Sequence, residues 1–365
     1  MKILVLTTDA YGVKGGIAQY NRDFLASLCS SPLVGEVVAI PRQAPDELGK
    51  LPAKLGFVTS GLNSKAKYAQ AVFNKAILGD KFDLVICGHI NLLPFAWLAS
   101  RRHQAPLALM IYGIDAWQPH HIGLINRLAK RIHSVISISN VTMKKFLAWA
   151  APRDCQQFIM PNAIDLTRYS PGKKSSVLLE RYGLMGKKVL ATMGRLSANE
   201  RYKGFDEILD VLPSLQTEVP DLAYLVMGDG DDRARLEEKA RRLNGSAKIV
   251  FTGYVAESEK LDHYRLADAY VMPSRGEGFG FVFLEAMAAG IPVVASNVDG
   301  GYEAVREGML GEVVNPAKPD EIRQGIRQAL NQPCGVVPEG LEYFSFDNFE
   351  RRVHEFLVQV SIARV

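Results

Sequence analysis

The stretch PSRGEGFGFVFLEAMAAGIPVVAS, residues 273–296, decides the fold expected of this chain. Its first residues close an apolar run typical of a strand, and SRGEGFG follows as a glycine-rich loop. The segment FVFLEAMAAG predicts a helix that Gly290 ends, with Pro292 just beyond it. IPVVAS predicts the next strand. This order of strand, loop, helix and strand indicates one βαβ unit of a parallel sheet.

The same loop and helix predict a ligand site. Glycines at 276, 278 and 280 let the backbone approach a ligand closely, and the helix start offers free N–H groups. Glu277 lies in the loop, and Glu285 lies near the second helical turn. A nucleotide sugar could engage both acids, its pyranose at Glu277 and its ribose at Glu285. Two acids at this spacing are by themselves ordinary, but the surrounding loop and helix favour the functional interpretation.

The alternation of strand-like and helix-like runs extends along the whole chain. Short apolar runs rich in β-branched residues are KILVLT, EVVAI, DLVIC, PLALMI, SVISIS and QQFIM in the first half, and KKVLATMG, AYLVMG, AKIVFTG, AYVMPS, IPVVAS and GEVV in the second. Amphipathic runs of helical length lie at 16–29, 121–131, 140–149, 203–216, 232–243 and 318–330. The pattern predicts an α/β fold with parallel sheets covered on both faces.

The pattern pauses once, at PNAIDLTRYSPGKKSS, residues 161–176, which is rich in Pro, Gly and Ser and predicts a linker. We therefore expect two Rossmann-like, doubly wound domains that face each other across a cleft. The first spans 1–167, and the second spans 168–345. The amphipathic segment 346–365 follows the second domain, and we expect this helix to pack back on the first.

Composition and charge narrow the class of protein. The chain has 365 residues, 48% of them hydrophobic and 22% charged, which fits two globular domains. The four scattered cysteines lack metal-ligand spacing, and no apolar run is long enough to cross a bilayer. The apolar run at the N-terminus is too short for a signal peptide. These features favour a cytoplasmic protein with reduced thiols, and we expect no nucleic-acid partner.

The charge is unevenly distributed. Residues 1–170 hold 19 lysines and arginines against 10 acids, whereas residues 171–365 hold 24 against 29. The basic first half favours an anionic partner, such as a phosphorylated lipid or peripheral contact with the inner face of the plasma membrane. The alternative is a surface that serves solubility alone.

Two cations follow the first strand of the second half. Arg195 comes directly after KKVLATMG, and Lys203 precedes a predicted helix. Placed there, both could neutralise a leaving diphosphate without a metal, although a pair of surface cations is the common alternative. The segment SANERY between them is long, so Arg201 could compete with Lys203. Gly204 and the helix that follows directly favour Lys203.

The segment EGFGFVFLEAMAAGIPVVAS resembles the signature of the family 4 retaining glycosyltransferases, which have the GT-B fold. The resemblance covers nearly the whole chain, and it implies that the first domain lies on the acceptor side and that the second binds the donor. GGIAQYNRDFLASL is similar to the first glycine loop and helix of the family, and IMPNAIDLTRYSP to its interdomain linker. MGRLSANERYKGFDEILDVLPSL resembles the diphosphate-binding segment, and LVMGDGDDRARLEEKA and IVFTGYV the base-binding region.

This resemblance implies transfer of a hexose, with retention, from a nucleoside-diphosphate sugar to a hydroxyl acceptor in polysaccharide biosynthesis. A UDP-sugar is favoured and GDP-mannose is the alternative; the acceptor is expected to be a glycan or a lipid-linked sugar. The implied catalytic residues are Glu277, Arg195 and Lys203. The last two are also expected to bind the donor, together with Gly15, Gly16, Tyr254, Val255, Gly278, Phe279, Gly280, Phe281 and Glu285. No cofactor and no metal ion are expected.

The chain departs from the family pattern in MIYGIDAW, residues 110–117. Family members often have His-Gly here, facing the donor sugar, whereas this chain has Tyr112-Gly113, with Asp115 two residues on. Tyr112 and Asp115 are candidate sugar or acceptor contacts. His89 is a third candidate, although a lone histidine is more often structural.

Two rival functions stay open at this point. One is a nucleotide-sugar epimerase on a similar fold, and the other is an inactive nucleotide-sugar-binding protein. The presence of Glu277, Glu285, Arg195 and Lys203 argues against the second, because loss of activity would be expected to erase some of them.

Overall fold

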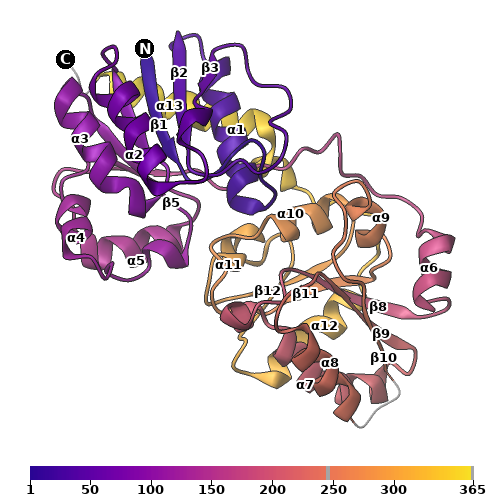
Figure 1. The fold of residues 1–365 in the computed structure, drawn as a ribbon. Helices are drawn as coiled ribbons and strands as arrows, with labels where there is room; N and C mark the ends of the chain where they lie inside the picture. Colours follow the sequence, from indigo (N-terminus) through magenta and orange to yellow (C-terminus); the bar gives the residue numbers. More distant parts are fainter. Residues whose placement is uncertain (244–246, 363–365) are drawn as a thin grey trace. The chain divides into compact units, whose positions relative to one another are not determined.

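A computed structural model describes residues 1–243 and 247–362 (Figure 1). The chain divides into two compact units, the first made of residues 1–163 and 346–365 and the second of residues 164–345. The strands of the first unit are β1 (Lys2–Thr7), β2 (Glu36–Pro41), β3 (Leu55–Phe57), β4 (Leu84–Cys87), β5 (Leu107–Ile111), β6 (Ser134–Ser137) and β7 (Gln156–Ile159). Those of the second are β8 (Lys188–Met193), β9 (Leu222–Met227), β10 (Lys248–Phe251), β11 (Ala269–Met272), β12 (Val293–Ser296) and β13 (Glu312–Val314).

Each unit contains one parallel sheet. The first sheet has the strand order β3-β2-β1-β4-β5-β6-β7, and the second has the order β10-β9-β8-β11-β12-β13. The strand order reverses between β1 and β4 in the first sheet, and between β8 and β11 in the second. In open α/β sheets, ligands bind outside the carboxyl ends of the strands at such a reversal. The loops after β8 and β11 are therefore where the second unit is expected to bind its ligand.

Helices lie between the strands. In the first unit they are α1 (Gly16–Ser30), α2 (Lys65–Val72), α3 (Leu93–His103), α4 (Gly123–Ala129), α5 (Asn140–Ala150) and α13 (Phe346–Ile362). In the second they are α6 (Ser176–Tyr182), α7 (Phe205–Glu218), α8 (Arg233–Arg242), α9 (Lys260–Tyr264), α10 (Phe281–Ala288), α11 (Gly301–Ala304) and α12 (Pro319–Leu330). Shorter helical segments are η1 (Thr59–Gly61), η2 (Phe73–Ile77), η3 (Ile90–Leu92), η4 (Ile114–Ala116), η5 (Ala198–Lys203), η6 (Arg306–Gly308) and η7 (Leu341–Phe344).

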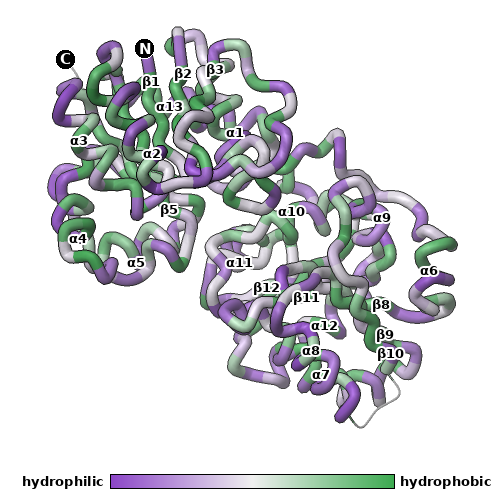
Figure 2. The backbone as a smooth tube through the Cα atoms, in the orientation of Figure 1, coloured by the Kyte–Doolittle hydropathy of each residue, from purple (hydrophilic) through white to green (hydrophobic). Residues whose placement is uncertain are grey.

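The second unit has a core on each face of its sheet, because side chains of successive strand residues point to opposite faces. Tyr224, Val226 and Val271 pack with residues of α7, α8 and α12 on one face, and α10 and α11 contact β12. Figure 2 shows hydrophobic colour along β8 and β9 and hydrophilic colour over much of α7 and α8. Continuous apolar strands between two helical layers are what a doubly wound parallel sheet requires.

The first unit is completed by the C-terminal helix. Helix α13 packs on α1. The ring of Phe349 meets that of Tyr20 edge-on at 5.5 Å between centroids, and Phe356 meets Phe158 at 5.0 Å. All four side chains are buried, with relative exposures of at most 9%. Burial of these aromatic side chains holds α13 beside α1. In the sequence, the 182 residues of the second unit separate α13 from the rest of the first unit.

The prediction of two Rossmann-like, parallel-sheet domains is confirmed. The prediction that they face each other across a cleft stays a prediction. Strand β3 was missed: it has three residues, and Gly56 at its centre carries no side chain that would mark a strand. No helix within residues 1–243 and 247–362 is both long and apolar enough to cross a membrane.

Candidate functional site

The loop between β11 and α10 carries Glu277 with its side chain partly accessible, at 21% relative exposure. The loop can fold this tightly because Gly280, which precedes α10, has a φ of 95°, a backbone conformation that glycine adopts readily. A Cβ at Gly280 would lie 2.8 Å from the ring of Phe283. The predicted loop and helix are both present, with Glu277 in the loop and Glu285 in the helix.

The backbone of Glu277 is held on both sides by the loop that follows β12. The N–H of Glu277 donates to Oδ2 of Asp299 at 2.8 Å, and its carbonyl accepts from the N–H of Gly300 at 2.9 Å. Asp299 is fully buried and also accepts from the hydroxyl of Ser274 and the N–H of Gly301. Burial raises the pKa of Asp299 to about 7, with a smaller contribution from the charge of Glu277.

Gly300 is required for this contact. A Cβ at residue 300 would lie 2.0 Å from the carbonyl oxygen of Gly278, closer than two such atoms can approach. The two loops after β11 and β12 therefore meet through backbone atoms. Asp299 was not among the predicted site residues, because its partners lie 22 and 25 residues earlier in the chain.

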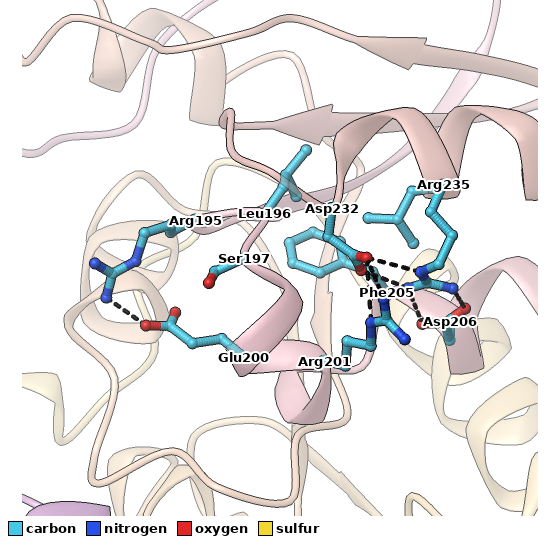
Figure 3. Close-up of a pocket in the computed structure, with 10 residues that line it drawn as sticks. Arg195, Leu196, Ser197, Glu200, Arg201, Phe205, Asp206, Asp232 and Arg235 are labelled. Atoms are coloured by element: carbon cyan, nitrogen blue, oxygen red, sulfur yellow. Dashed lines mark hydrogen bonds and ion pairs between the residues drawn. The ribbon is translucent and has the colours of Figure 1, made fainter.

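Arg195 and Lys203 share one acidic partner, Glu200, and Figure 3 shows the contact between Arg195 and Glu200. The guanidinium of Arg195 donates to Oε1 of Glu200, and Nζ of Lys203 lies 3.5 Å from Oε2 of the same carboxylate. Nζ of Lys203 is also 3.9 Å from Oε2 of Glu277. The side chain of Lys203 is 17% exposed and that of Arg195 is 70% exposed. The structure therefore brings together three predicted residues, Arg195, Lys203 and Glu277, with Glu200 among them.

Arg201 turns away from this group. Its Nε and Nη2 atoms lie 3.1 and 2.8 Å from Oδ1 of Asp232, and Figure 3 shows it on the side of the segment opposite Arg195. Asp232 is buried and also binds Arg235, and these hydrogen bonds hold the pKa of Asp232 below its usual value, the bond from Arg235 most strongly. Lys203 therefore faces Glu277, whereas Arg201 faces Asp232, and the assignment of Lys203 as the second diphosphate cation stays a prediction.

Glu285 is almost completely buried, at 5% relative exposure, and three side chains already donate to it. The hydroxyl of Tyr169 lies 2.9 Å and Nζ of Lys260 lies 2.5 Å from Oε1, and the hydroxyl of Tyr264 lies 2.7 Å from Oε2. A carboxylate has about four acceptor positions, so one is left for a ligand hydroxyl. Glu285 thus also links α10 to α9 and to the segment that begins the second unit.

The remaining donor-site candidates differ in exposure. Tyr254, after β10, is 65% exposed, and Val255 beside it is partly exposed. Phe281 begins α10 and is partly exposed. The side chain of Phe279 is buried against Phe344, with 5.4 Å between ring centroids, so only its backbone is placed to reach a ligand. Gly278 is buried with its carbonyl against Gly300.

In the first unit, Gly15 and Gly16 are exposed at the start of α1, and Gly15 has a φ of 126°. His89 follows β4, where its Nδ1 accepts from the N–H of Asn91 at 3.1 Å. Burial lowers the pKa of His89 to about 4, helped by the charge of Arg42. Its imidazole is therefore neutral at neutral pH, and because Nδ1 accepts, the proton is on Nε2, which can donate one hydrogen bond.

Tyr112 is buried, and its hydroxyl donates to Oδ1 of Asn21 at 2.7 Å. Asn21 in turn donates to Oγ1 of Thr7 and to the carbonyl of Asp9, so these groups tie α1 to the ends of β1 and β5. Burial raises the pKa of Tyr112 well above its usual value. This hydroxyl is committed to the fold, which leaves Asp115 as the better placed of the two candidates after β5.

Asp115 has one carboxylate oxygen in use and one unsatisfied. The N–H of Tyr112 donates to Oδ1 at 3.3 Å, and the buried Oδ2 has no hydrogen-bond partner among residues 1–243 and 247–362. Burial raises the pKa of Asp115 to about 7, because the charged form loses its hydration. In the same ranges, no group of three or more His, Cys, Asp and Glu side chains could hold a metal ion.

Comparison with known families identifies the second unit first. Residues 180–343 match the family model of the glycosyl transferases group 1, and this range takes up most of that unit. The two parallel doubly wound sheets and this match define a glycosyltransferase with the GT-B fold.

Relatives with known names cover more of the chain. It is 30% identical over 238 residues to the GDP-mannose-dependent alpha-(1-6)-phosphatidylinositol monomannoside mannosyltransferase of Mycolicibacterium smegmatis, over 62% of this chain and 61% of that one. It is 26% identical to the enzyme of that name from Mycobacterium tuberculosis H37Rv, over 90% and 89%. Among solved structures, Anabaena Alr3699/HepE in complex with UDP has a TM-score of 0.76 at 21% identity, over 98% of this chain and 100% of that one. Sucrose-phosphate synthase from Thermosynechococcus elongatus has a TM-score of 0.78 at 18% identity, over 99% of each chain.

The chain therefore resembles the glycosyltransferases of family 4, and its second unit matches the model of the glycosyl transferases group 1.

Proposed function

We propose that the protein transfers mannose, with retention, from GDP-mannose to a hydroxyl of a lipid-linked acceptor. The observation that carries the proposal is the group formed by Arg195, Lys203 and Glu277. A loop carboxylate, a half-buried lysine and an exposed arginine meet at the carboxyl edge of the second sheet, within 3.9 Å for the Lys203–Glu277 pair. That edge is where a doubly wound sheet binds nucleotides.

The choice of donor rests on the relatives. The sequence alone favours a UDP-sugar, but the mannosyltransferases that align with 61% and 89% of their own length are GDP-mannose-dependent by name. The UDP complex shares 21% identity with this chain and supports the fold alone. We therefore place GDP-mannose first and keep UDP-glucose as the second donor to test.

The mechanism follows from charge and position. As the bond between the sugar and the diphosphate breaks, negative charge grows on the diphosphate, and Arg195 and Lys203 stabilise it. The free amides at the start of α10 add to this stabilisation. Glu277 accepts hydrogen bonds from hydroxyls of the sugar and holds it, while the leaving phosphate oxygen takes the proton of the acceptor hydroxyl. These groups supply the charge that a metal ion supplies in other transferases, so no metal is required.

The acceptor is proposed from two indications. Both mannosyltransferase relatives are named for a phosphatidylinositol monomannoside. The first half of this chain also has an excess of nine positive charges, which favours an acceptor with an anionic headgroup. A glycan acceptor without a lipid is the alternative.

The experiment is an assay of the full chain with GDP-mannose, in the presence and absence of phosphatidylinositol mannoside, followed by mass spectrometry of the lipid. We expect a mannose to be added to the lipid and GDP to be released only when the acceptor is present. An α-linkage by NMR would support retention. Conversion of the sugar nucleotide without acceptor would indicate an epimerase instead, and binding with no turnover of any donor would indicate an inactive binder.

A further inference from the structure

Glu200 lies between the two cations proposed to bind the diphosphate. Its Oε1 accepts from Arg195 (Figure 3), and its Oε2 is 3.5 Å from Nζ of Lys203. Within the described ranges, Oε2 is buried and has no hydrogen-bond partner beyond this ion pair. The side chain is 16% exposed, although it sits in a surface segment.

The local backbone aims this carboxylate inward. Segment η5 is broken at Glu200, whose φ of −122° and ψ of 29° are not helical. Ser197 shapes the turn before Glu200. The carbonyl of Ser197 accepts from the N–H of Glu200, and the hydroxyl of Ser197 accepts from the N–H of Asn199. The N–H of Ala198 donates to Asp231, which fixes the start of the segment. The backbone of Glu200 is thus held in an ordered turn.

The charges around Glu200 are matched by ion pairs within the protein. Arg195 has Glu200 as its ion-pair partner among the described residues, and Lys203 is shared by Glu200 and Glu277. A diphosphate that approaches these cations meets a carboxylate already in place. Two anions cannot both occupy this position without mutual repulsion, so one of them must move.

We propose that Glu200 is an internal counter-anion of the donor site, which the donor diphosphate displaces from Arg195 and Lys203. Glu200 then sets the affinity for the donor, because every binding event includes the breaking of its two ion pairs. It also keeps the site from retaining the nucleoside diphosphate product, since the carboxylate returns as the product leaves. This inference rests on the proposed function for the identity of the diphosphate ligand.

The test is calorimetric titration of wild type and Glu200→Gln with GDP and with inorganic pyrophosphate. We expect the variant to bind both ligands about three- to tenfold more tightly, the range that follows from the loss of one partly exposed and one half-buried ion pair. The affinity should also fall more steeply with added NaCl in the variant, because its cations meet the ligand without an internal anion. A residue with a purely structural role would not steepen the salt dependence.

The matched control is Glu218→Gln. This change also removes one negative charge and one Glu–Arg pair, with Arg327 at 3.2 Å, but at the end of α7. We expect its affinities to stay within about twofold of wild type. Unchanged or weaker binding by Glu200→Gln, with a thermal melting point near that of wild type, would overturn the inference. Failure of wild type to bind any nucleotide would instead count against the proposed function, so the two can be told apart.

Discussion

At the scale of single residues, Arg195 and Lys203 differ in how much the protein surrounds them. Arg195 is 70% exposed and reaches the site from the end of β8, whereas Lys203 is 17% exposed and lies between Glu200 and Glu277. Their shared neighbour Glu200 makes them one electrostatic unit. Arg201 is only two residues from Lys203, but it belongs to a different electrostatic unit, which it forms with Asp232 and Arg235.

Arg195→Ala and Lys203→Ala should each slow sugar transfer by about 10²-fold, because each removes a charge that stabilises the leaving diphosphate. The measurement is kcat/KM for sugar transfer, with circular dichroism to verify the fold. Arg201→Ala is the internal control: its guanidinium is bound to Asp232, so its kcat/KM should stay within about threefold of wild type. A large loss in Arg201→Ala with little loss in Lys203→Ala would reverse the assignment.

Asp299→Asn should lower kcat for sugar transfer by about tenfold, because a loop shifted by a fraction of an ångström misplaces Glu277. The affinity for free GDP should stay within about twofold of wild type, because the nucleotide contacts are left intact. An amide cannot accept on both sides as the carboxylate does, so either Glu277 or Gly301 loses its partner. Asp268→Asn is the control, since Asp268 also accepts from a backbone N–H, that of Val189, but outside this loop pair. Equal losses of kcat in both variants would assign the effect to general destabilisation.

At the scale of the elements, most strands were predicted, because they are short, apolar and largely buried, as β1 and β12 are. The run KILVLT coincides with β1. The run IPVVAS coincides with β12 except for its first two residues, which precede the strand. The glycine loop and the helix after it were also predictable, since glycines and a following proline mark both ends. These local signals suffice to place Glu277 in a loop and Glu285 in a helix.

What the sequence could not show is which groups meet across the sheet. Glu285 was expected to have free oxygens for a ribose, yet Tyr169, Tyr264 and Lys260 donate to it from other parts of the chain. Asp299 and Glu200 were missed for the same reason: their importance lies in contacts that form only when the chain folds. Such contacts have no local sequence signal, unlike the periodicity of a strand or a helix.

The turn after β5 gives a prediction on stability. Because the pKa of Asp115 is raised from 3.8 to about 7, the folded state keeps a proton between these values that the unfolded state has already released. The free energy of unfolding should therefore fall as pH rises from about 4 to about 7, by up to roughly 1.4 kcal/mol per pH unit for this group. Urea unfolding of wild type and Asp115→Asn at about pH 5 and pH 7.5 measures this. The variant should lose less stability over that interval, and parallel profiles would contradict the assignment.

At the scale of the whole molecule, two units of similar architecture have different chemistry. The second unit holds the charged group around Lys203 and matches the glycosyl transferase family model. The first has the neutral His89, the buried Tyr112 and the half-satisfied Asp115 at the ends of its strands. This division fits a donor site in one unit and an acceptor site in the other, as proposed for the transfer reaction.

Transfer by the full chain should continue in excess EDTA, because Arg195, Lys203 and the helix amides provide the positive charge. The assay compares initial rates of GDP release with EDTA, with Mg²⁺ and with Mn²⁺, at constant ionic strength. Rates within about twofold of one another are expected. Loss of activity in EDTA that Mg²⁺ or Mn²⁺ restores would show that the charge stabilisation described here is incomplete.

The most direct test of the donor site is a calorimetric comparison of Glu277→Gln and Glu285→Gln, each titrated with GDP and with GDP-mannose. Glu277 is proposed to hold the sugar and Glu285 the ribose, and a charged hydrogen bond is worth roughly 1.5–3 kcal/mol. Glu285→Gln should therefore bind both ligands at least about tenfold more weakly, with a lower melting point because three donors lose a charged acceptor. Glu277→Gln should bind GDP as wild type does and lose affinity only for GDP-mannose. Weaker GDP binding in Glu277→Gln, with wild-type GDP binding in Glu285→Gln, would contradict the account.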